Sequence, residues 1–418
     1  MAPLLVFALG FLCAAAQAQP GTSLTAAQYT EDFDHLWTRL GANYAYFDGK
    51  DTDWARVRAT YRPRIAAIDS RNEFIELLER VLDELYDPHT HLKTNTERST
   101  RLIPTGLDVW AEWRDGKAVI TQLRDGFSAQ QAGLAAGMEI VAINGTPVAA
   151  AVGERLPVAS KTSSEAAGNW ALLALLAGTH EKPRVIEARS AGGGSVATYR
   201  LDQPGHLTAD RYRADLKVES KRLEDNLGYI RINDLGSDVT VAAFDAALER
   251  LRSTRGLVID LRATQGGGDT AVAEPIMGRL IARRMAYQRG KPVHGRLWIR
   301  EVSPRGRWTY AAPVVVLVGR WTASMGEGMA IGLDAMGRAT VVGTRMAGLN
   351  GAVSDLRLPN TGIRVNYAAE KLFHLNGMPR EAFVPPLLVD PASGVDVDAI
   401  LAAGIETLRN SAGRKQSP

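Results

Sequence analysis

The feature that most constrains the fold is an alternation of buried strands and helices in the second half of the chain. Strand patterns rich in Val, Ile and Leu occupy residues 228–232, 256–261 and 314–318, and helical patterns follow the first two. Strands that are joined through helices run parallel, because the helix carries the chain back to the edge of the sheet where the next strand starts. We therefore predict an α/β core with a largely parallel sheet over residues 206–408, followed by a polar tail over residues 409–418.

The region before this core is predicted to be helical, and we assign residues 19–95 to an N-terminal helical domain. Its clearest helix carries apolar residues at the spacing of one buried face, namely Phe74, Leu77, Leu78, Val81, Leu82 and Leu85. Asn72 is the expected N-cap of this helix. Pro88 ends the helical pattern, because proline disfavours helical geometry in the residue before it. The turn around Pro88 presents two histidines, His89 and His91.

Residues 96–205 form a separate predicted domain that is rich in short strands. Alternating patterns occupy residues 118–121 and 140–143, and the second is followed by Asn144 and Gly145, a pair typical of tight turns. The glycine run at residues 192–194 predicts a hairpin turn or a flexible loop. This composition indicates a small β-rich domain between the helical domain and the core.

The N-terminus predicts export. The first 18 residues are uncharged and largely apolar, and they are typical of a signal peptide cleaved after Ala18. No later segment approaches the roughly 20 apolar residues that a membrane span needs. Cys13, the only cysteine, lies inside this segment, so the mature chain has no disulfide, thiol nucleophile or cysteine-ligated metal. The 49 basic and 46 acidic residues are interspersed, which leaves no basic stripe for nucleic acid. We expect a periplasmic or secreted protein without a lipid anchor or a cofactor.

Two segments of the core carry groups that are suited to catalysis. Residues 260–268 end a buried strand in three consecutive glycines, whose amides could approach a ligand closely. A structural turn is the simpler interpretation of these glycines. Residues 318–327 lead from a strand into a helix that begins near Ser324, whose hydroxyl would lie at the positive end of the helix dipole. An ordinary N-cap would explain this serine equally well, so neither segment is decisive alone.

The order of these segments resembles the core of the carboxy-terminal processing (tail-specific) peptidases. That family has a strand ending Asp-Leu-Arg with a Gly-Gly turn, then Thr-x-Ser-x-x-Glu, then Val-x-Gly-Glu/Thr, and residues 260–268, 322–327 and 339–344 follow the same order here. The resemblance implies a crotonase-like ββα-spiral core with Ser324 as the nucleophile. It also implies an oxyanion hole formed by the backbone amides of Gly266, Gly267 and Met325.

The β-rich domain resembles the PDZ domains of bacterial proteases. Gly-Leu-x-x-Gly occurs at residues 133–137, and Ile-Asn-Gly-x-x-Val occurs at residues 143–148. Such domains take a peptide as an added strand and hold its terminal carboxylate on backbone amides. The resemblance therefore implies peptide or protein partners, with Thr105, Gly106 and Leu107 as the carboxylate-binding loop.

The general base differs between the branches of this family. The Ser/Lys branch carries its lysine in a Gly-Lys-Gly segment, whereas residues 348–351 here read Gly-Leu-Asn-Gly. The tricorn-like branch instead uses a histidine from the N-terminal helical region and a glutamate after the nucleophile. Residues 87–90 and 380–386 resemble those two motifs, which implies His89 as general base and Glu381 as the carboxylate that orients it. Pro88 replaces a serine of that branch, so the relay must be shorter or use Thr90 or water.

Other interpretations stay open. The helical domain also resembles the cap of retinoid-binding proteins that share this fold, so a non-catalytic ligand-binding scaffold is one alternative. His89 and His91 would face the same way on an extended segment and would suit a metal-dependent hydrolase, although no further ligand stands at a recognisable spacing. His91 is also the second choice as general base. The combination of Ser324, His89 and Glu381 favours a serine endopeptidase that cleaves peptides or unfolded protein tails. The substrate and the oligomeric state are left open.

Overall fold

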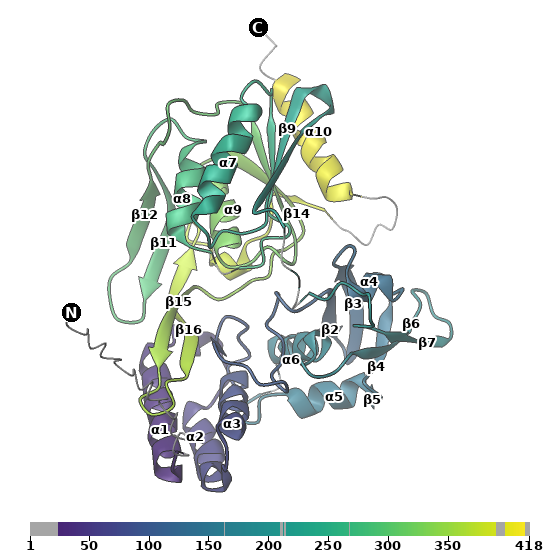
Figure 1. Ribbon diagram of the computed structural model, residues 1–418, viewed down its shortest axis with the longest axis vertical. Helices are drawn as coiled ribbons and strands as arrows, with labels where there is room; N and C mark the ends of the chain where they lie inside the picture. Colours follow the sequence, from purple (N-terminus) through teal and green to yellow (C-terminus); the bar gives the residue numbers. More distant parts are fainter. Residues whose placement is uncertain are drawn as a thin grey trace, which may run out of the picture.

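The computed structural model describes residues 24–162, 164–209, 212, 215–266, 268–389 and 398–413, with the backbone alone for residues 412 and 413. The predicted signal peptide, Gly267 and residues 414–418 of the predicted tail lie outside the described residues. Figure 1 shows three parts: an α/β core, a helical N-terminal part and a β-rich module beside the helices.

The core is built on a six-stranded sheet in the order β17-β14-β13-β10-β9-β8. Its strands are β8 (Val218–Leu223), β9 (Leu227–Ile232), β10 (Leu257–Asp260), β13 (Val314–Val318), β14 (Ala339–Gly343) and β17 (Leu387–Leu388). Every neighbouring pair is parallel except β8 with β9. The largely parallel sheet predicted from the strand and helix alternation is therefore confirmed.

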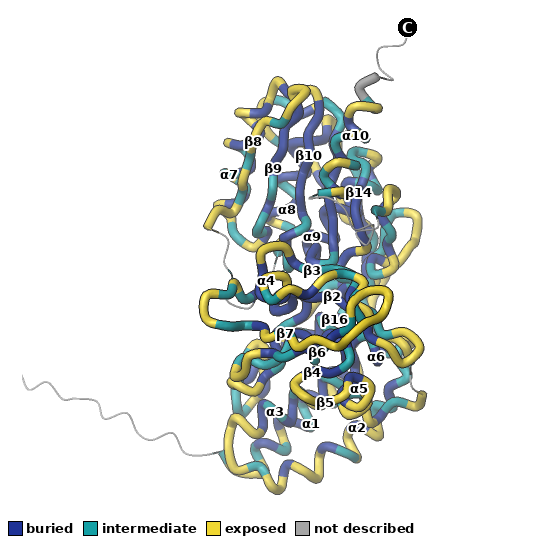
Figure 2. Tube along the Cα trace, turned by 90° about the vertical axis from the view of Figure 1, so that its right-hand side faces the viewer, coloured by how far each residue is buried: buried dark blue, intermediate teal, exposed yellow. Residues whose placement is uncertain are grey.

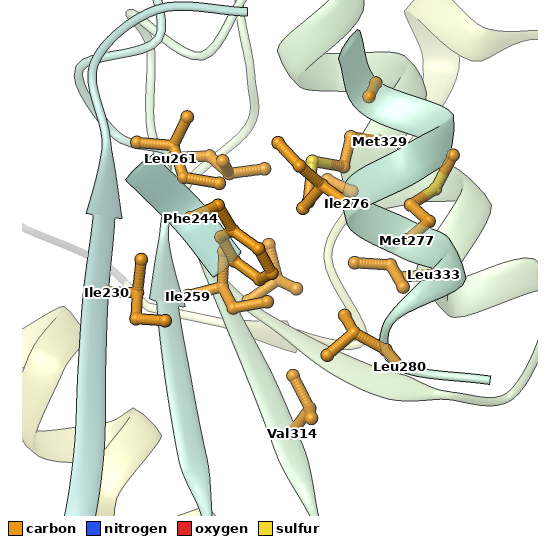
Figure 3. Close-up of a cluster of buried hydrophobic side chains, with 14 of the residues drawn as sticks. Ile230, Phe244, Ile259, Leu261, Ile276, Met277, Leu280, Val314, Met329 and Leu333 are labelled. Atoms are coloured by element: carbon orange, nitrogen blue, oxygen red, sulfur yellow. The ribbon is translucent and has the colours of Figure 1, made fainter. Parts of the chain in front are cut away.

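Helices cover both faces of this sheet. They are α7 (Val239–Arg250), α8 (Thr270–Gly278), α9 (Met325–Ala335) and α10 (Ala399–Gly413). Ile259 of β10 packs into a cluster with Phe244 of α7 and Met329 of α9 (Figure 3). Its neighbour Val258 points to the other face and belongs to a cluster with Leu408 of α10. Burial on both faces explains why these strands are continuous apolar runs. Figure 2 shows these strands as a buried interior.

A five-stranded sheet connects the core to the helical part. Its strands are β1 (His91–Leu92), β11 (Met285–Pro292), β12 (Trp298–Val302), β15 (Ala352–Arg357) and β16 (Arg364–Phe373). β1 pairs antiparallel with β16, and His91 lies opposite Asn366. Because the histidine turn directly precedes β1, this pairing holds that turn against the core.

The N-terminal part contains the predicted helices. They are α1 (Ala26–Asn43), α2 (Trp54–Tyr61) and α3 (Arg71–Asp83), with short 3-10 helices η1 (Phe47–Gly49) and η2 (Arg62–Ala67). The apolar face predicted for α3 is buried, which confirms the periodicity argument. The N-cap is Ser70 and not Asn72, because the Ser70 hydroxyl accepts the amide of Glu73.

The β-rich module is a six-stranded antiparallel sheet with three short helices. Its strands are β2 (Val109–Arg114), β3 (Lys117–Leu123), β4 (Glu139–Ile143), β5 (Thr146–Pro147), β6 (Val185–Arg189) and β7 (Val196–Arg200). Its helices are α4 (Ser128–Gln131), α5 (Val148–Arg155) and α6 (Glu165–Ala177). The glycine run predicted to turn a hairpin lies between β6 and β7, which pair antiparallel.

Two further observations concern the ends and the surface of the chain. The predicted polar tail begins at residue 409, but α10 continues through the first part of it to Gly413. Leu408, the residue before the predicted tail, is buried against the sheet. Within the described ranges, no helix is long and apolar enough to cross a membrane.

Candidate active site

Ser324 lies where β13 passes into α9. Its backbone has φ 53° and ψ −111°, a left-handed conformation that costs a residue other than glycine on the order of 1–3 kcal/mol. Hydrogen bonds of the two preceding residues hold this conformation. Thr322 bonds Gly319 and Leu261 through its hydroxyl, and the Ala323 amide donates to the Thr264 carbonyl at 2.9 Å. A strained serine at the carboxyl end of a buried parallel strand is a candidate nucleophile.

The glycine turn after β10 packs directly against Ser324. A Cβ atom on Gly266 would lie 3.5 Å from the Ser324 Cβ, and a Cβ on Gly268 would lie 2.3 Å from the Met325 Cβ. Gly266 has φ +112°, which a residue with a side chain rarely adopts. The amides of Gly266 and Met325 donate to no other described residue, so both are available to an oxygen that develops negative charge. Gly267, also assigned to this hole, lies outside the described residues.

Glu327 fixes the backbone around the serine. This side chain is fully buried, and its Oε2 accepts the Ser324 amide at 2.7 Å. Its Oε1 accepts the amides of Gly348 at 2.9 Å and Leu349 at 3.3 Å. Burial raises the pKa of Glu327 to about 7, while the charge of Arg380 and the three amides favour the carboxylate. The Glu327 carboxylate therefore connects Ser324 to the loop of residues 348–351.

His89 is held on the other side of the same loop. The Asp87 carboxylate accepts the His89 amide, the Thr90 hydroxyl and the Tyr44 hydroxyl, at 2.9–3.0 Å. The His89 Nδ1 lies 2.6 Å from the Asn350 carbonyl oxygen. In the neutral tautomer that donates from Nδ1 to this oxygen, Nε2 is free to accept a proton. Burial and the charge of Arg380 lower the pKa of His89 to about 4, so the imidazole is neutral near pH 7.

Arg380 completes the enclosure of the loop. Its Nη2 donates to the carbonyls of Leu349 at 2.8 Å and Gly351 at 2.7 Å, and its Nη1 lies 3.5 Å from the Ser324 carbonyl. Arg380 directly precedes Glu381, but no sequence motif assigned it a role. Glu327 and Asn350 likewise received no catalytic role from the sequence. The three-residue spacing from Ser324 to Glu327 was the available signal, because it is the spacing of a capping box.

Glu381 lies near this assembly without contacting the imidazole. Its Oε2 is 3.4 Å from the Tyr46 hydroxyl, and burial raises its pKa. No hydrogen bond joins Glu381 to His89, or the Ser324 hydroxyl to His89, among the described residues. Lys371 is the only lysine between Ser324 and the C-terminal tail. Its ammonium group pairs with Asp48 at 2.6 Å.

His91 does not share the environment of His89. Its Nδ1 lies 2.9 Å from the carbonyl oxygen of Leu92, and its ring lines a cavity of about 80 Å³ beside α3. Over the ranges that the structure describes, no three His, Cys, Asp or Glu side chains gather in a way that could hold a metal ion.

The predicted carboxylate-binding loop lies against the core. The Thr105 hydroxyl is 3.4 Å from the Gln265 carbonyl, and Trp321 donates its indole N–H to the Leu107 carbonyl at 2.7 Å. The amides of Gly106 and Leu107 donate to carbonyls of the same turn, those of Leu102 and Pro104. Binding of a carboxylate on these two amides would require the turn to open.

Comparisons with known proteins relate this chain to peptidases. Residues 226–383 match the model of peptidase family S41, and residues 25–83 match that of the tricorn protease C1 domain. The chain is 26% identical over 378 residues to the chloroplastic C-terminal processing peptidase of Tetradesmus obliquus, covering 84% of this chain and 75% of that one. It is 23% identical over 350 residues to tricorn protease homolog 1 of Streptomyces coelicolor, covering 80% of this chain but only 30% of the homolog.

Solved structures share the fold. The photosystem II D1 C-terminal processing protease superimposes with a TM-score of 0.57 at 21% identity, covering 91% of this chain and 98% of that one. Mature CPAF superimposes with a TM-score of 0.59 at 15% identity, covering 93% and 96% of the two chains. These structures show a shared fold, whereas the matches in sequence support a serine peptidase whose residues 226–383 are similar to peptidase family S41 and whose residues 25–83 are similar to the tricorn protease C1 domain.

Proposed function

We propose that this chain is an exported serine endopeptidase that cleaves peptides or unfolded protein tails through an acyl-enzyme, with Ser324 as nucleophile and His89 as general base. The observation that supports this assignment best is the loop of residues 348–351. Its amides bind Glu327, which binds Ser324, and its Asn350 carbonyl binds His89. One short backbone segment thus sets the position of both reacting groups, although they come from opposite ends of the chain.

The proposed chemistry uses the side-chain and backbone atoms that have no partner among the described residues. The His89 Nε2 removes the Ser324 hydroxyl proton while Oγ attacks the scissile carbonyl carbon, and the amides of Gly266 and Met325, with Gly267, stabilise the resulting oxyanion. Collapse of the tetrahedral intermediate breaks the C–N bond, and imidazolium returns the proton to the leaving amine. Water then attacks the acyl-enzyme while His89 takes its proton, the ester C–O bond breaks, and the imidazolium returns the proton to Ser324 Oγ as the new carboxyl product leaves.

The Asn350 carbonyl does for His89 what a carboxylate does in a charged triad, because it accepts the Nδ1 proton and fixes the tautomer. A neutral carbonyl stabilises imidazolium less than a carboxylate would, and Asp87 supplies negative charge nearby. Glu381 acts through Tyr46 in this proposal, as an electrostatic partner of the cluster that also contains Asp87.

The β-rich module would serve as a PDZ domain that holds the substrate terminus at the loop of Thr105, Gly106 and Leu107, and the core would be of the crotonase-like type. The fit of the module rests on its antiparallel sheet, its helices and its contact with Gln265 beside the glycine turn. Export rests on the sequence of residues 1–18.

Labelling with a fluorophosphonate tests the nucleophile. We expect modification of the purified chain at Ser324, located by peptide mass spectrometry, and loss of labelling in Ser324→Ala and His89→Ala. An unlabelled but folded wild-type chain would favour the non-catalytic scaffold. Activity that chelators abolish and zinc restores would favour the metal-dependent hydrolase.

A further inference from the structure

A groove of about 590 Å³ lies between the β-rich module and the core, and none of the residues assigned to catalysis lines it. One wall comes from the end of β3 and the turn after it, with Arg124 and Phe127. The other wall comes from β8, β9 and the end of β10, with Lys221, Arg231 and Asp260. Trp321, three residues before the nucleophile, also lines it. The groove therefore opens at the carboxyl ends of the parallel strands, where α/β sheets commonly bind ligands.

Two of the three carboxylates that line the groove are bound by Arg262. Arg262 pairs with Asp260 at 2.6 Å and with Asp398 at 2.5 Å, so these carboxylates are already engaged. Asp125 is exposed at the rim. Arg124, Lys221 and Arg231 form no ion pair with any described residue. Among the residues that the structure describes, these three cations have no carboxylate partner.

The contacts of these three cations are to neutral groups. Arg124 donates to the Gln265 side-chain oxygen at 2.8 Å, Arg231 donates to the Asn233 side-chain oxygen at 2.9 Å, and the Lys221 ammonium lies 5.1 Å from the centre of the Tyr229 ring. Glu219 lies opposite Arg231 in the β8–β9 pairing, but it accepts a hydrogen bond from Asn233 and does not pair with the guanidinium.

Arg124 is the most informative of the three. Its side chain is only 7% exposed, and its guanidinium carbon lies 4.0 Å from the centre of the Phe127 ring. Removing a cation from water without a counter-ion is unfavourable, and burial accordingly lowers the pKa of Arg124 to about 10. An anion that entered the groove would relieve this cost and would meet Lys221 and Arg231 on the facing wall.

We propose that this groove binds carboxylates of the polypeptide substrate, so that the enzyme selects acidic tails. The proposal rests on the proposed peptidase function and names its substrate class. A polypeptide is favoured over a small anion because Arg124 bonds Gln265, the residue directly before Gly266, and Trp321 lies near Ser324. A chain extending from the scissile bond along the ends of β10 and β13 would enter this groove.

The test measures binding without turnover. Full-length Ser324→Ala protein is titrated, by fluorescence anisotropy, into two labelled peptides that differ only by three glutamates changed to glutamine, each made with a free and an amidated terminus. We expect the acidic peptide to bind about tenfold more tightly at low salt, with the difference shrinking as ionic strength rises. The double change Lys221→Gln and Arg231→Gln should remove the preference and leave the affinity for the glutamine peptide unchanged.

A matched control removes two positive charges outside the groove. Arg222 neighbours Lys221 on the opposite face of β8 and Arg250 lies on α7, so Arg222→Gln with Arg250→Gln should preserve the preference. Equal binding of the acidic and neutral peptides, or a preference that survives the loss of Lys221 and Arg231, would overturn the proposal. A preference that amidation abolishes would assign the bound carboxylate to the substrate terminus. The binding test uses an inactive variant and does not depend on turnover. A wild-type chain that fluorophosphonate does not label would therefore refute the peptidase function and leave the result on acidic peptides standing.

Discussion

Replacement of Glu327 by glutamine tests whether the carboxylate behind the nucleophile is part of the catalytic geometry. Glutamine keeps the size of the side chain but offers one acceptor oxygen where three amides converge, from Ser324, Gly348 and Leu349. Its NH₂ group must therefore face an amide donor. If it faces Ser324, a buried N–H loses its partner, at a cost of about 1–3 kcal/mol. Expressed at the transition state, this cost corresponds to a decrease in kcat of about 5- to 150-fold.

The effect of Glu327→Gln on stability should differ from its effect on rate. Because burial raises the pKa of Glu327 above its ordinary value, its stabilising contribution is fully present below about pH 4.5 and is lost as pH rises through about 7. At pH 8 the substitution removes a buried charge as well as an acceptor, and these two effects oppose each other. We expect the urea midpoint at pH 8 to change little, by the equivalent of less than about 1 kcal/mol.

Glu84 provides the matched control. It is equally buried, in the helical part, and it accepts the Tyr61 hydroxyl at 2.6 Å and the amides of Val158 and Ala159. Glu84→Gln should lower the urea midpoint and leave kcat for a fluorogenic peptide near the wild-type value. The pH profile adds a second criterion, because ionisation of Glu327 should raise wild-type kcat through about pH 7 and Glu327→Gln should lack this limb. Wild-type kcat in Glu327→Gln, or an equal loss of kcat in Glu84→Gln, would refute the positioning role.

The remaining predictions concern His89 and its supports. Ser324→Ala and His89→Ala should each lower kcat by about 10³-fold or more, with the double variant little worse; additive losses in steady-state kinetics would contradict a single catalytic unit. Because the pKa of His89 is lowered to about 4, its protonation should reduce kcat/KM only well below pH 6.5, and an acid limb at 6.5 that persists in Glu327→Gln would contradict this. Arg380→Gln should move the His89 limb toward higher pH, because it removes a nearby positive charge, and should lower kcat, because it removes two loop contacts. Glu381→Gln should lower kcat less than about tenfold, because its carboxylate contacts Tyr46; a loss equal to that of His89→Ala would place Glu381 in the relay.

The parts of the fold that could be predicted from sequence are those with a periodic or conformational signature. The buried strands of the core are apolar runs because helices cover both faces of their sheet, and α3 shows the spacing of one buried face. The position of Ser324 between a buried strand and a helix start did not by itself separate a candidate nucleophile from an N-cap, and the order of the neighbouring motifs was needed to single it out. The N-cap of α3 was misplaced by two residues because Ser70 and Asn72 are both good caps, and only the hydrogen bond to Glu73 separates them.

The groups that orient His89 have no comparable signature in the sequence. His89 is oriented by the carbonyl of Asn350, and Arg380 binds the carbonyls of Leu349 and Gly351; any residue supplies a carbonyl, so no side-chain pattern marks these contacts. What the sequence does restrict is the path of that backbone. Gly351 has φ +40°, and a Cβ atom there would lie 1.7 Å from the Glu370 carbonyl oxygen and 2.8 Å from the Tyr46 hydroxyl.

The segment that lacks a lysine therefore has a positive role that its side chains do not reveal. The Leu349 side chain is buried, while its amide and carbonyl reach Glu327 and Arg380. The Asn350 carbonyl, directly after it, meets the histidine that would replace the lysine as base. A lysine base acts from its own side chain, whereas a histidine base brought from the N-terminal helical part needs an acceptor on the core to fix its tautomer. In the proposed mechanism, residues 348–351 orient the base through the Asn350 carbonyl, whereas the corresponding segment of the Ser/Lys branch supplies a lysine as the base itself.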